Sequence, residues 1–218
     1  TKYAGTTPID YTHYYYGALR VQAGTNANNA MTLSQTQKTA ARPGAETITA
    51  DTKSITYYKG DVGLEQSDYT AKYANSVVVD YTAYYYDVSG TATRANNSTT
   101  INARLSLSHT TTTAIAPAAG ANANTKSITA YLGGVGNEQS DITTKYAGLT
   151  PIDYTYYYYG AGNAQAGTTV NTAMKTSQTQ KTLVRPTAGT PTAETKSITA
   201  YLGNVGEERP EGDGVDDG

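Results

Sequence analysis

Apolar and polar residues alternate along three tyrosine-rich stretches, which read IDYTHYYYG from residue 9, VDYTAYYYD from residue 79 and IDYTYYYYG from residue 152. Successive side chains of an extended strand point to opposite faces. In the first stretch, one face carries Ile9, Tyr11, His13 and Tyr15, and the other carries Asp10, Thr12, Tyr14 and Tyr16. TKSITAYLG from residue 125 and ARLSLS from residue 103 alternate in the same way. Each stretch is predicted to be a half-buried strand.

These stretches belong to a repeat with a period of 70 to 73 residues. Asp10, Asp80 and Asp153 mark it, together with the KYA lysines (Lys2, Lys72, Lys145) and the TKSIT lysines (Lys53, Lys126, Lys196). We expect three tandem modules of about 72 residues, at 1–70, 71–143 and 144–218, the third ending in an acidic, glycine-rich tail. The middle module is three residues longer, and we expect the extra residues in the loop-like stretch 109–124.

Turn residues separate the predicted strands every 8 to 15 positions, as in GTNANN, RPGAE and LGGVGNE. No stretch combines helix caps with a useful 3.6-residue apolar period. The sequence therefore predicts an all-β fold of three β-sandwich-like repeats, each with six or seven short strands.

Composition limits the core and the chemistry. The chain has 21 tyrosines but no phenylalanine, tryptophan or cysteine, and its formal charge is -2. Tyrosine must then supply much of the buried area, with its hydroxyl reaching a polar partner. Without cysteine, the chain has no thiolate nucleophile and no thiolate metal ligand. No run approaches 18 apolar residues, so we expect no membrane span.

The tyrosine strands are the main candidate binding surface. Six tyrosines are predicted to form either an aromatic platform or a subunit contact: Tyr14, Tyr16, Tyr84, Tyr86, Tyr157 and Tyr159. A platform would stack sugars or bases, whereas the competing interpretation places these rings in the core and at module junctions. The 16 basic residues are scattered among 18 acidic ones, so we expect no nucleic-acid partner.

Recurring acids raise the question of a metal. The three strand aspartates recur in phase, and further acids lie in GDVGLEQSD and GGVGNEQSD. Calcium takes six to eight oxygen ligands, and these segments lack that density of acids. We therefore expect solvent-facing or turn-capping roles, with no metal and no other cofactor.

The two histidines, His13 and His109, occupy non-equivalent positions, and Ala83 and Tyr156 replace the first. A position that accepts His, Ala and Tyr is expected to be neither catalytic nor tightly packed. No histidine is marked for a Ser-His-Asp arrangement, and GGVGNE lacks the Lys-Ser/Thr of a phosphate loop. The sequence predicts no enzyme.

The period, the Thr- and Tyr-rich strands and the missing catalytic set resemble the tandem Ig-like or other β-sandwich modules of phage virion and bacterial surface proteins. The resemblance is one of architecture, since the Cys, Trp and Cys of antibody-type domains are absent. It implies an extracellular, cell-surface or virion structural protein, a subunit of a fibre, filament or coat. Its partners would be other copies of itself or other structural subunits. The alternative is a glycan-binding adhesin that uses the tyrosine strands to hold surface glycans.

Overall fold

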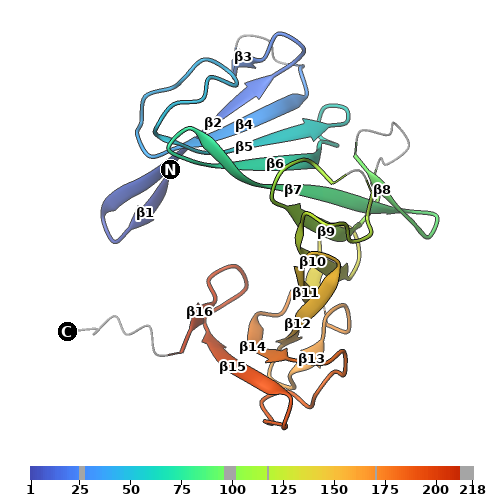
Figure 1. Ribbon diagram of the computed structural model, residues 1–218. Coiled ribbons are helices and arrows are strands. Elements are labelled where there is room, and N and C mark those ends of the chain that lie inside the picture. The colour runs from blue at the N-terminus through green and yellow to red at the C-terminus, as the bar shows by residue number, and fades with distance from the viewer. Residues whose placement is uncertain (25–27, 96–101, 117, 170, 212–218) are drawn as a thin grey trace. The chain divides into compact units, whose positions relative to one another are not determined.

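The computed structural model describes the whole chain except residues 25–27, 96–101, 117, 170 and 212–218. The described residues form strands and no helix, so the predicted all-β class is confirmed (Figure 1). The first nine strands are β1 (Lys2–Ala4), β2 (Thr7–Tyr16), β3 (Val21–Gln22), β4 (Met31–Gln37), β5 (Thr52–Lys59), β6 (Gln66–Ala74), β7 (Val77–Val88), β8 (Thr91–Arg94) and β9 (Leu105–Thr111). The others are β10 (Thr125–Leu132), β11 (Gln139–Ala147), β12 (Thr150–Tyr159), β13 (Ala164–Gln165), β14 (Met174–Gln180), β15 (Thr195–Leu202) and β16 (Arg209–Pro210).

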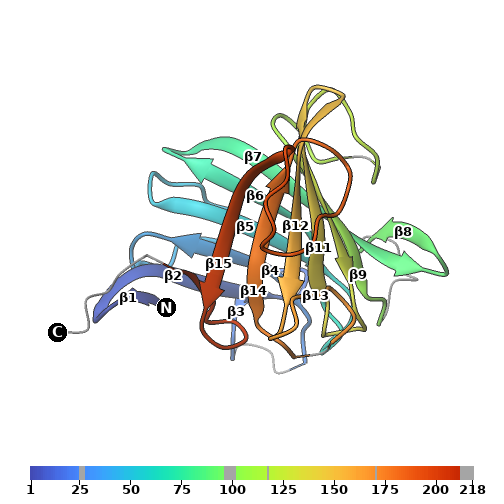
Figure 2. The same cartoon turned by 90° about the horizontal axis from the view of Figure 1, so that it is seen from below.

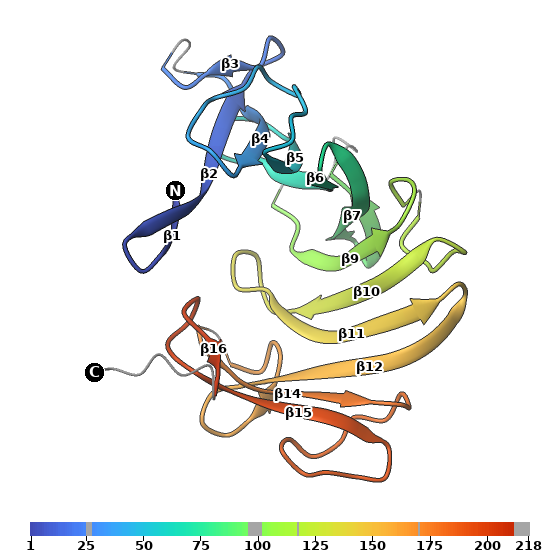
Figure 3. The same ribbon diagram turned by 60° about the vertical axis from the view of Figure 1, so that its left-hand side comes forward.

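The chain divides into two compact units, residues 1–103 with 108–120, and residues 104–107 with 121–218. In the first unit the strands follow the order β1-β2-β4-β5-β6-β7, with β3 paired to β2 and β8 paired to β7 (Figure 2). In the second unit the order is β10-β11-β12-β14-β15-β16, with β13 paired to β12 (Figure 3). These strand pairs are antiparallel.

The predicted module boundaries fall inside strands. Residues 70/71 lie in β6 and residues 143/144 lie in β11, and each of these strands is paired along both of its edges. The 27-residue passage from Lys53 to Asp80 is the antiparallel meander β5-β6-β7. A module junction is therefore ordinary sheet, without a linker, and the division into three modules stays a prediction from the sequence.

The segment between β4 and β5, residues 38–51, covers one face of the first unit's sheet. The core of this unit lies between the segment and the sheet. Tyr15, Leu33 and Ile55 are buried together, and Ala45 of the segment packs on them. The Tyr15 hydroxyl donates to the backbone carbonyl of Pro43 at 2.7 Å. The second unit repeats this arrangement with residues 181–194. Hydrogen bonds to backbone carbonyls thus supplement a small apolar core.

Buried amides hold the covering segments from the middle of the sheet. Gln35 Nε2 donates to the Thr47 carbonyl and Gln178 Nε2 to the Thr190 carbonyl, both at 2.8 Å. His109 takes the same place in the middle copy, with its Nδ1 at 3.1 Å from the Ala118 carbonyl. The local phrases LSQTQ, LSHTT and TSQTQ align these three residues. His109 is therefore a structural substitute for glutamine.

The first threonine of TKSIT anchors the end of each covering segment. Thr52 is 1% exposed, and its hydroxyl accepts from the Thr49 amide at 2.9 Å and from Gln37 Nε2 at 3.0 Å. Thr195 accepts from the Thr192 amide and Gln180 Nε2 at 2.8 and 2.9 Å. This is a local turn of the type that threonine side chains favour.

Hydroxyl pairs join neighbouring strands on the opposite face of the sheet. Their oxygens lie 2.8 to 3.1 Å apart in Thr12–Thr36, Thr56–Thr70, Thr82–Thr110, Thr129–Thr143 and Thr155–Thr179. Cross-strand threonine pairs of this kind stabilise a sheet by a few tenths of a kcal/mol up to ~1 kcal/mol each. The abundance of threonine in the sequence is explained by these pairs and by the turn anchors.

The expected position of the middle copy's extra residues is wrong. Thr82 and Thr110 are bonded 28 residues apart, whereas Thr12–Thr36 and Thr155–Thr179 are each 24 apart. Four residues are therefore added before β9, and one is lost after it, since Thr110 precedes Thr125 by 15 residues and Thr36 precedes Thr52 by 16. Two of the four lengthen the β8 hairpin, which supplies Arg94, since Tyr85 pairs with Arg94 nine positions on and Tyr15 pairs with Gln22 seven positions on. A loop-like composition at 109–124 misled the prediction because that segment is the covering layer of the core.

Replacing Thr52 with valine is expected to lower the free energy of unfolding by about 2 kcal/mol. The substitution keeps the shape but leaves the Thr49 amide and Gln37 Nε2 without an acceptor in a buried place. Chemical denaturation followed by circular dichroism measures the change. Thr39→Val, at an exposed position, is the matched control and is expected to stay within about 0.5 kcal/mol. Equal stability of the two variants would contradict the anchoring role.

Candidate functional site

Four of the six predicted tyrosines are tied to the strand beside them. Tyr84 and Tyr157 share hydrogen bonds with Thr70 and Thr143, at 3.2 and 3.0 Å. Tyr86 and Tyr159 are each 8% exposed. Their hydroxyls donate to the carbonyls of Ser67 and Ser140, at 3.0 and 2.9 Å. The hydroxyls therefore serve as cross-strand ties to β6 and β11.

Tyr14 and Tyr16 differ because β1 is short. β1 pairs with β2 only from Thr7 to Asp10, and β3 pairs with it only at Tyr15 and Tyr16, so no strand of the described residues pairs with Tyr11 to Tyr14 on that side. Tyr14 is 45% exposed, the largest exposure among the six. Three strands separate β2 from β7, which places Tyr14 and Tyr84 about 19 Å apart across the sheet. The six rings are thus distributed in pairs along the fold.

A stacked column of side chains that sequence reasoning missed lies in the first unit. The rings of Tyr57 and Tyr69 stack with centroids 4.4 Å apart and planes 18° from parallel. Arg20 lies over Tyr57 and Arg94 over Tyr69, at 5.9 and 5.7 Å from the ring centroids. Both ends of the column are ion-paired, Arg20 with Glu46 and Arg94 with Asp68.

This column leaves no free ring face for a ligand, although a pocket of about 430 Å3 lies beside it. Its sequence signal is a departure from the repeat. Tyr57 stands where the later copies have Ala130 and Ala200, and Tyr69 stands where the middle copy has Ile142. The residues that indicate the column are therefore those that differ between copies, and not those of the repeated motif.

The repeated aspartates are paired with the repeated lysines. Asp10 forms an ion pair with Lys53, and Asp153 forms one with Lys196. The sheet register also places Lys2 opposite Asp10, and Lys145 opposite Asp153. Each aspartate therefore lies between two cations. The TKSIT lysines are 43% exposed, so solvent screening limits each pair to at most ~1 kcal/mol.

The repeated glutamates cap backbone amides, as the turn-capping interpretation expects. Glu65 Oε1 accepts from the Met31 amide at 3.0 Å, and Glu138 and Glu208 accept from Leu105 and Met174 at 3.0 and 3.1 Å. Each cap joins a turn to the start of a strand two positions away in the sheet. Among the described residues, no three His, Asp or Glu side chains gather as a metal site would require.

The position of His13 is more tightly packed than the sequence suggested. His13, Ala83 and Tyr156 are all buried, at 9%, 0% and 3% exposure, so the expectation of a loosely packed position is wrong. Burial and the nearby Arg42 guanidinium lower the pKa of His13 below its usual value.

In two places an arginine forms an ion pair with an aspartate of β6 or β11. Arg94 donates to Asp68 and Arg185 donates to Asp141, with nitrogen and oxygen 2.5 Å apart in both pairs. Arg185 also lies over the Tyr156 and Tyr158 rings. Arg42 is the equivalent of Arg185, but it is exposed, and no described carboxylate pairs with it.

The equivalent position of the middle copy is Ile115, and Arg94 from β8 replaces the missing arginine. The lengthened β8 hairpin and the divergent covering segment of the middle copy thus compensate for one another.

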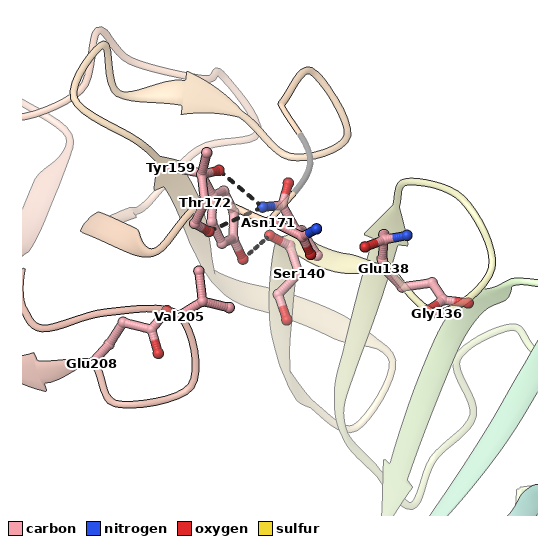
Figure 4. A pocket seen from close by; sticks show the side chains of 10 residues that line it. Gly136, Glu138, Ser140, Tyr159, Asn171, Thr172, Val205 and Glu208 are labelled. Carbon is pink, nitrogen blue, oxygen red and sulfur yellow. Dashed lines mark hydrogen bonds between the residues drawn. The ribbon is translucent and has the colours of Figure 1, made fainter.

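A small pocket lies beside Tyr159 in the second unit (Figure 4). Its volume is about 280 Å3, and its walls carry Glu138, Glu208, Asn171 and Val205. Both glutamates are already committed to backbone amides, and the Tyr159 hydroxyl is bonded to Ser140. Burial raises the pKa of Tyr159 far above its usual value, so its hydroxyl stays a donor at neutral pH. The pocket therefore offers no uncommitted acid or base.

Removing the Tyr159 hydroxyl, in Tyr159→Phe, is expected to lower the free energy of unfolding by about 1 kcal/mol, because the Ser140 carbonyl loses its donor. The control is Tyr14→Phe, whose exposed hydroxyl is expected to matter by less than about 0.5 kcal/mol in dilute protein. Denaturant titration measures both. A larger loss in Tyr14→Phe would contradict the assignment of Tyr159 as a cross-strand tie.

Acidification is expected to destabilise the fold through His109. Burial lowers its pKa in the folded chain, so the unfolded chain binds more protons below the unfolded value of 6.5. The stabilisation is complete above that pH and is lost as the pH falls toward the folded value. His109→Gln restores the residue of the other copies. It should reduce the loss between about pH 7.5 and 5.5 by on the order of 1 kcal/mol. An unchanged pH profile, from thermal melts, would contradict this role.

None of the described residues belongs to a helix of the length and apolarity that a membrane crossing requires. The tyrosines, acids and histidines that the sequence singled out are for the most part bonded to neighbouring strands, turns and covering segments. Neither a protein-family model, nor a curated protein, nor a solved structure matches this chain.

Proposed function

We propose that the chain is a non-enzymatic structural or surface-display protein, a subunit of an extracellular fibre, filament or virion coat. The observation that carries the proposal is the use of the repeated polar groups. Aspartates pair with lysines, glutamates cap amides and tyrosine hydroxyls bond to carbonyls, in the same way from copy to copy. A chain whose distinctive residues maintain its framework is suited to mechanical and display roles.

The histidines support the same proposal. An enzyme's general base must lie within hydrogen-bond reach of a substrate proton, usually beside an orienting group. His109 is buried and bonded to a backbone carbonyl of the covering segment, and His13 lies buried beside a cation. Neither arrangement favours proton transfer to a substrate.

The alternative function is a glycan-binding adhesin. Tyr14 is the observation that favours it, because its ring is nearly half exposed on the outer part of β2. Sugar platforms generally need several exposed rings beside polar groups. The equivalents of Tyr14 in the other copies, Tyr84 and Tyr157, have their hydroxyls bonded to β6 and β11. We therefore place this function second.

Electron microscopy of the purified chain, combined with a glycan array, tests the proposal. We expect fibres or regular assemblies at high protein concentration and no glycan signal above background. Tyr14→Ala on the array is the matched control for the alternative. A reproducible glycan signal that this substitution removes, from a chain that does not assemble, would replace the structural function with the adhesin.

A further inference from the structure

The two outer strands of the fold, β2 and β15, each keep an unpaired edge. β1 reaches β2 only up to Asp10, and β16 pairs with β15 only at Tyr201 and Leu202. Inside the fold, β6 instead pairs with β7 from Val77 to Ala83, and β11 pairs with β12 from Thr150 to Tyr156. Unpaired edges of this kind are templates for the addition of another strand.

The β2 edge keeps the side chains that recognise a neighbouring strand. Backbone groups of successive residues point to opposite sides of a strand, and the Tyr15 carbonyl accepts from Thr32 on the β4 side. The backbone groups of Thr12 and Tyr14 therefore face the open side, whereas those of Tyr16 face Val21 of β3. Arg42, whose equivalent Arg185 binds Asp141, here donates instead to the Tyr14 carbonyl at 3.2 Å. Its guanidinium is exposed at the place where β11 supplies an aspartate to β12.

The β15 edge carries the complementary half of such a strand. Glu208 caps Met174 as Glu65 caps Met31, so Arg209, Pro210 and Glu211 occupy the positions of Gln66, Ser67 and Asp68. The Glu211 amide donates to the Ala200 carbonyl at 2.8 Å. The Glu211 side chain is exposed and has no partner among the described residues. A carboxylate thus stands where the other copies place the acid that binds an arginine.

The apolar surface of β15 points to the same conclusion. Ile198 is 36% exposed, whereas its equivalent Ile55 is 1% exposed beneath the covering layer and between two full strands. Ser54 and Ser127 pair with Lys72 and Lys145 of the next strand, and Ser197 lacks that partner among the described residues. Lys2 of β1 has its aspartate, Asp10, but no serine on its other side.

We propose that the β15–β16 edge of one copy binds the β1–β2 edge of a second copy, head to tail, through a strand shared between them. Residues 209–211 of the first copy would fill the positions of 66–68, and residues 1–4 of the second would fill those of 71–74. Only two strand positions, about 7 Å, stay open between them. The inference rests on the proposed structural function and names its partner.

Three contacts define this interface, each with a precedent inside the chain. Arg42 binds Glu211 of the other copy, as Arg94 and Arg185 bind aspartates. The Tyr16 hydroxyl donates to the Pro210 carbonyl of the other copy, as Tyr86 and Tyr159 donate to serine carbonyls. Lys2 of one copy pairs with Ser197 of the other. Because the two patches differ, the contact is heterologous, and each copy keeps one patch free for a further copy.

A charge swap tests the interface in the full chain. Arg42→Glu and Glu211→Arg each place like charges opposite one another, and each should weaken association at least about 10-fold at low ionic strength. The double variant restores opposite charges in reversed order and should return to within about 3-fold of the original affinity. Sedimentation velocity over a range of concentrations measures the association constants.

Lys181→Glu is the matched control, since it makes the same charge change as Arg42→Glu at an exposed position of the second unit. It should leave association unchanged, and circular dichroism confirms that every variant folds. Assembly that survives in both single variants, or that the double variant fails to restore, would overturn this interface and leave the structural function standing. An unsubstituted chain that stays monomeric and binds glycans would overturn both.

Discussion

A shortage of large apolar side chains is the constraint on which the rest of this structure depends. The first unit's core contains Tyr15, Leu33 and Ile55, with Ala45, Tyr57 and Tyr73 only partly buried against them. A layer packed by so few residues needs directional bonds to stay in place. Gln35 and Tyr15 supply them by donating to the carbonyls of Thr47 and Pro43. Buried polar groups of this kind stabilise only when satisfied, so the covering segment and the sheet depend on one another.

The same constraint explains why tyrosine replaces phenylalanine throughout. A phenylalanine at position 158 would bury a similar area but leave the Pro186 carbonyl without the donor that now lies 2.6 Å away. The tyrosine hydroxyls also act between strands, where Tyr86 and Tyr159 reach carbonyls of the adjacent strand. One residue type therefore serves as core, as loop anchor and as cross-strand tie, which accounts for the tyrosine runs.

Acidic and basic side chains lie along the same strands and turns, and their pairing helps to specify the register of the sheet. Lysines of one strand form ion pairs with aspartates two strands away, and turn glutamates reach amides two strands away. These contacts are weak individually where they are exposed, yet each is specific to one register. At the outer strands, Arg42 and Glu211 have no charged partner among the described residues, and the proposed contact between copies would pair them.

Strand character, the period and the all-β class could be predicted from the sequence alone, because alternation has a period of two residues and turn residues act locally. The capping role of Glu65 was also accessible, since it follows a glycine-rich turn. The pairing of Asp10 with Lys53 was not, although their spacing of 43 residues recurs between Asp153 and Lys196. Spacing along the chain does not say which strands become neighbours.

Tertiary structure alone decided which residues are buried and where the middle copy is longer. Nothing in the sequence marks Gln35 and His109 as buried, yet both are fully buried in the structure. The extra residues lie before β9, two of them in the hairpin whose Arg94 contacts Asp68, 26 residues away in sequence. Composition reports the chemistry of each residue, whereas burial and pairing depend on segments that fold back from far along the chain, and only their three-dimensional arrangement fixes them.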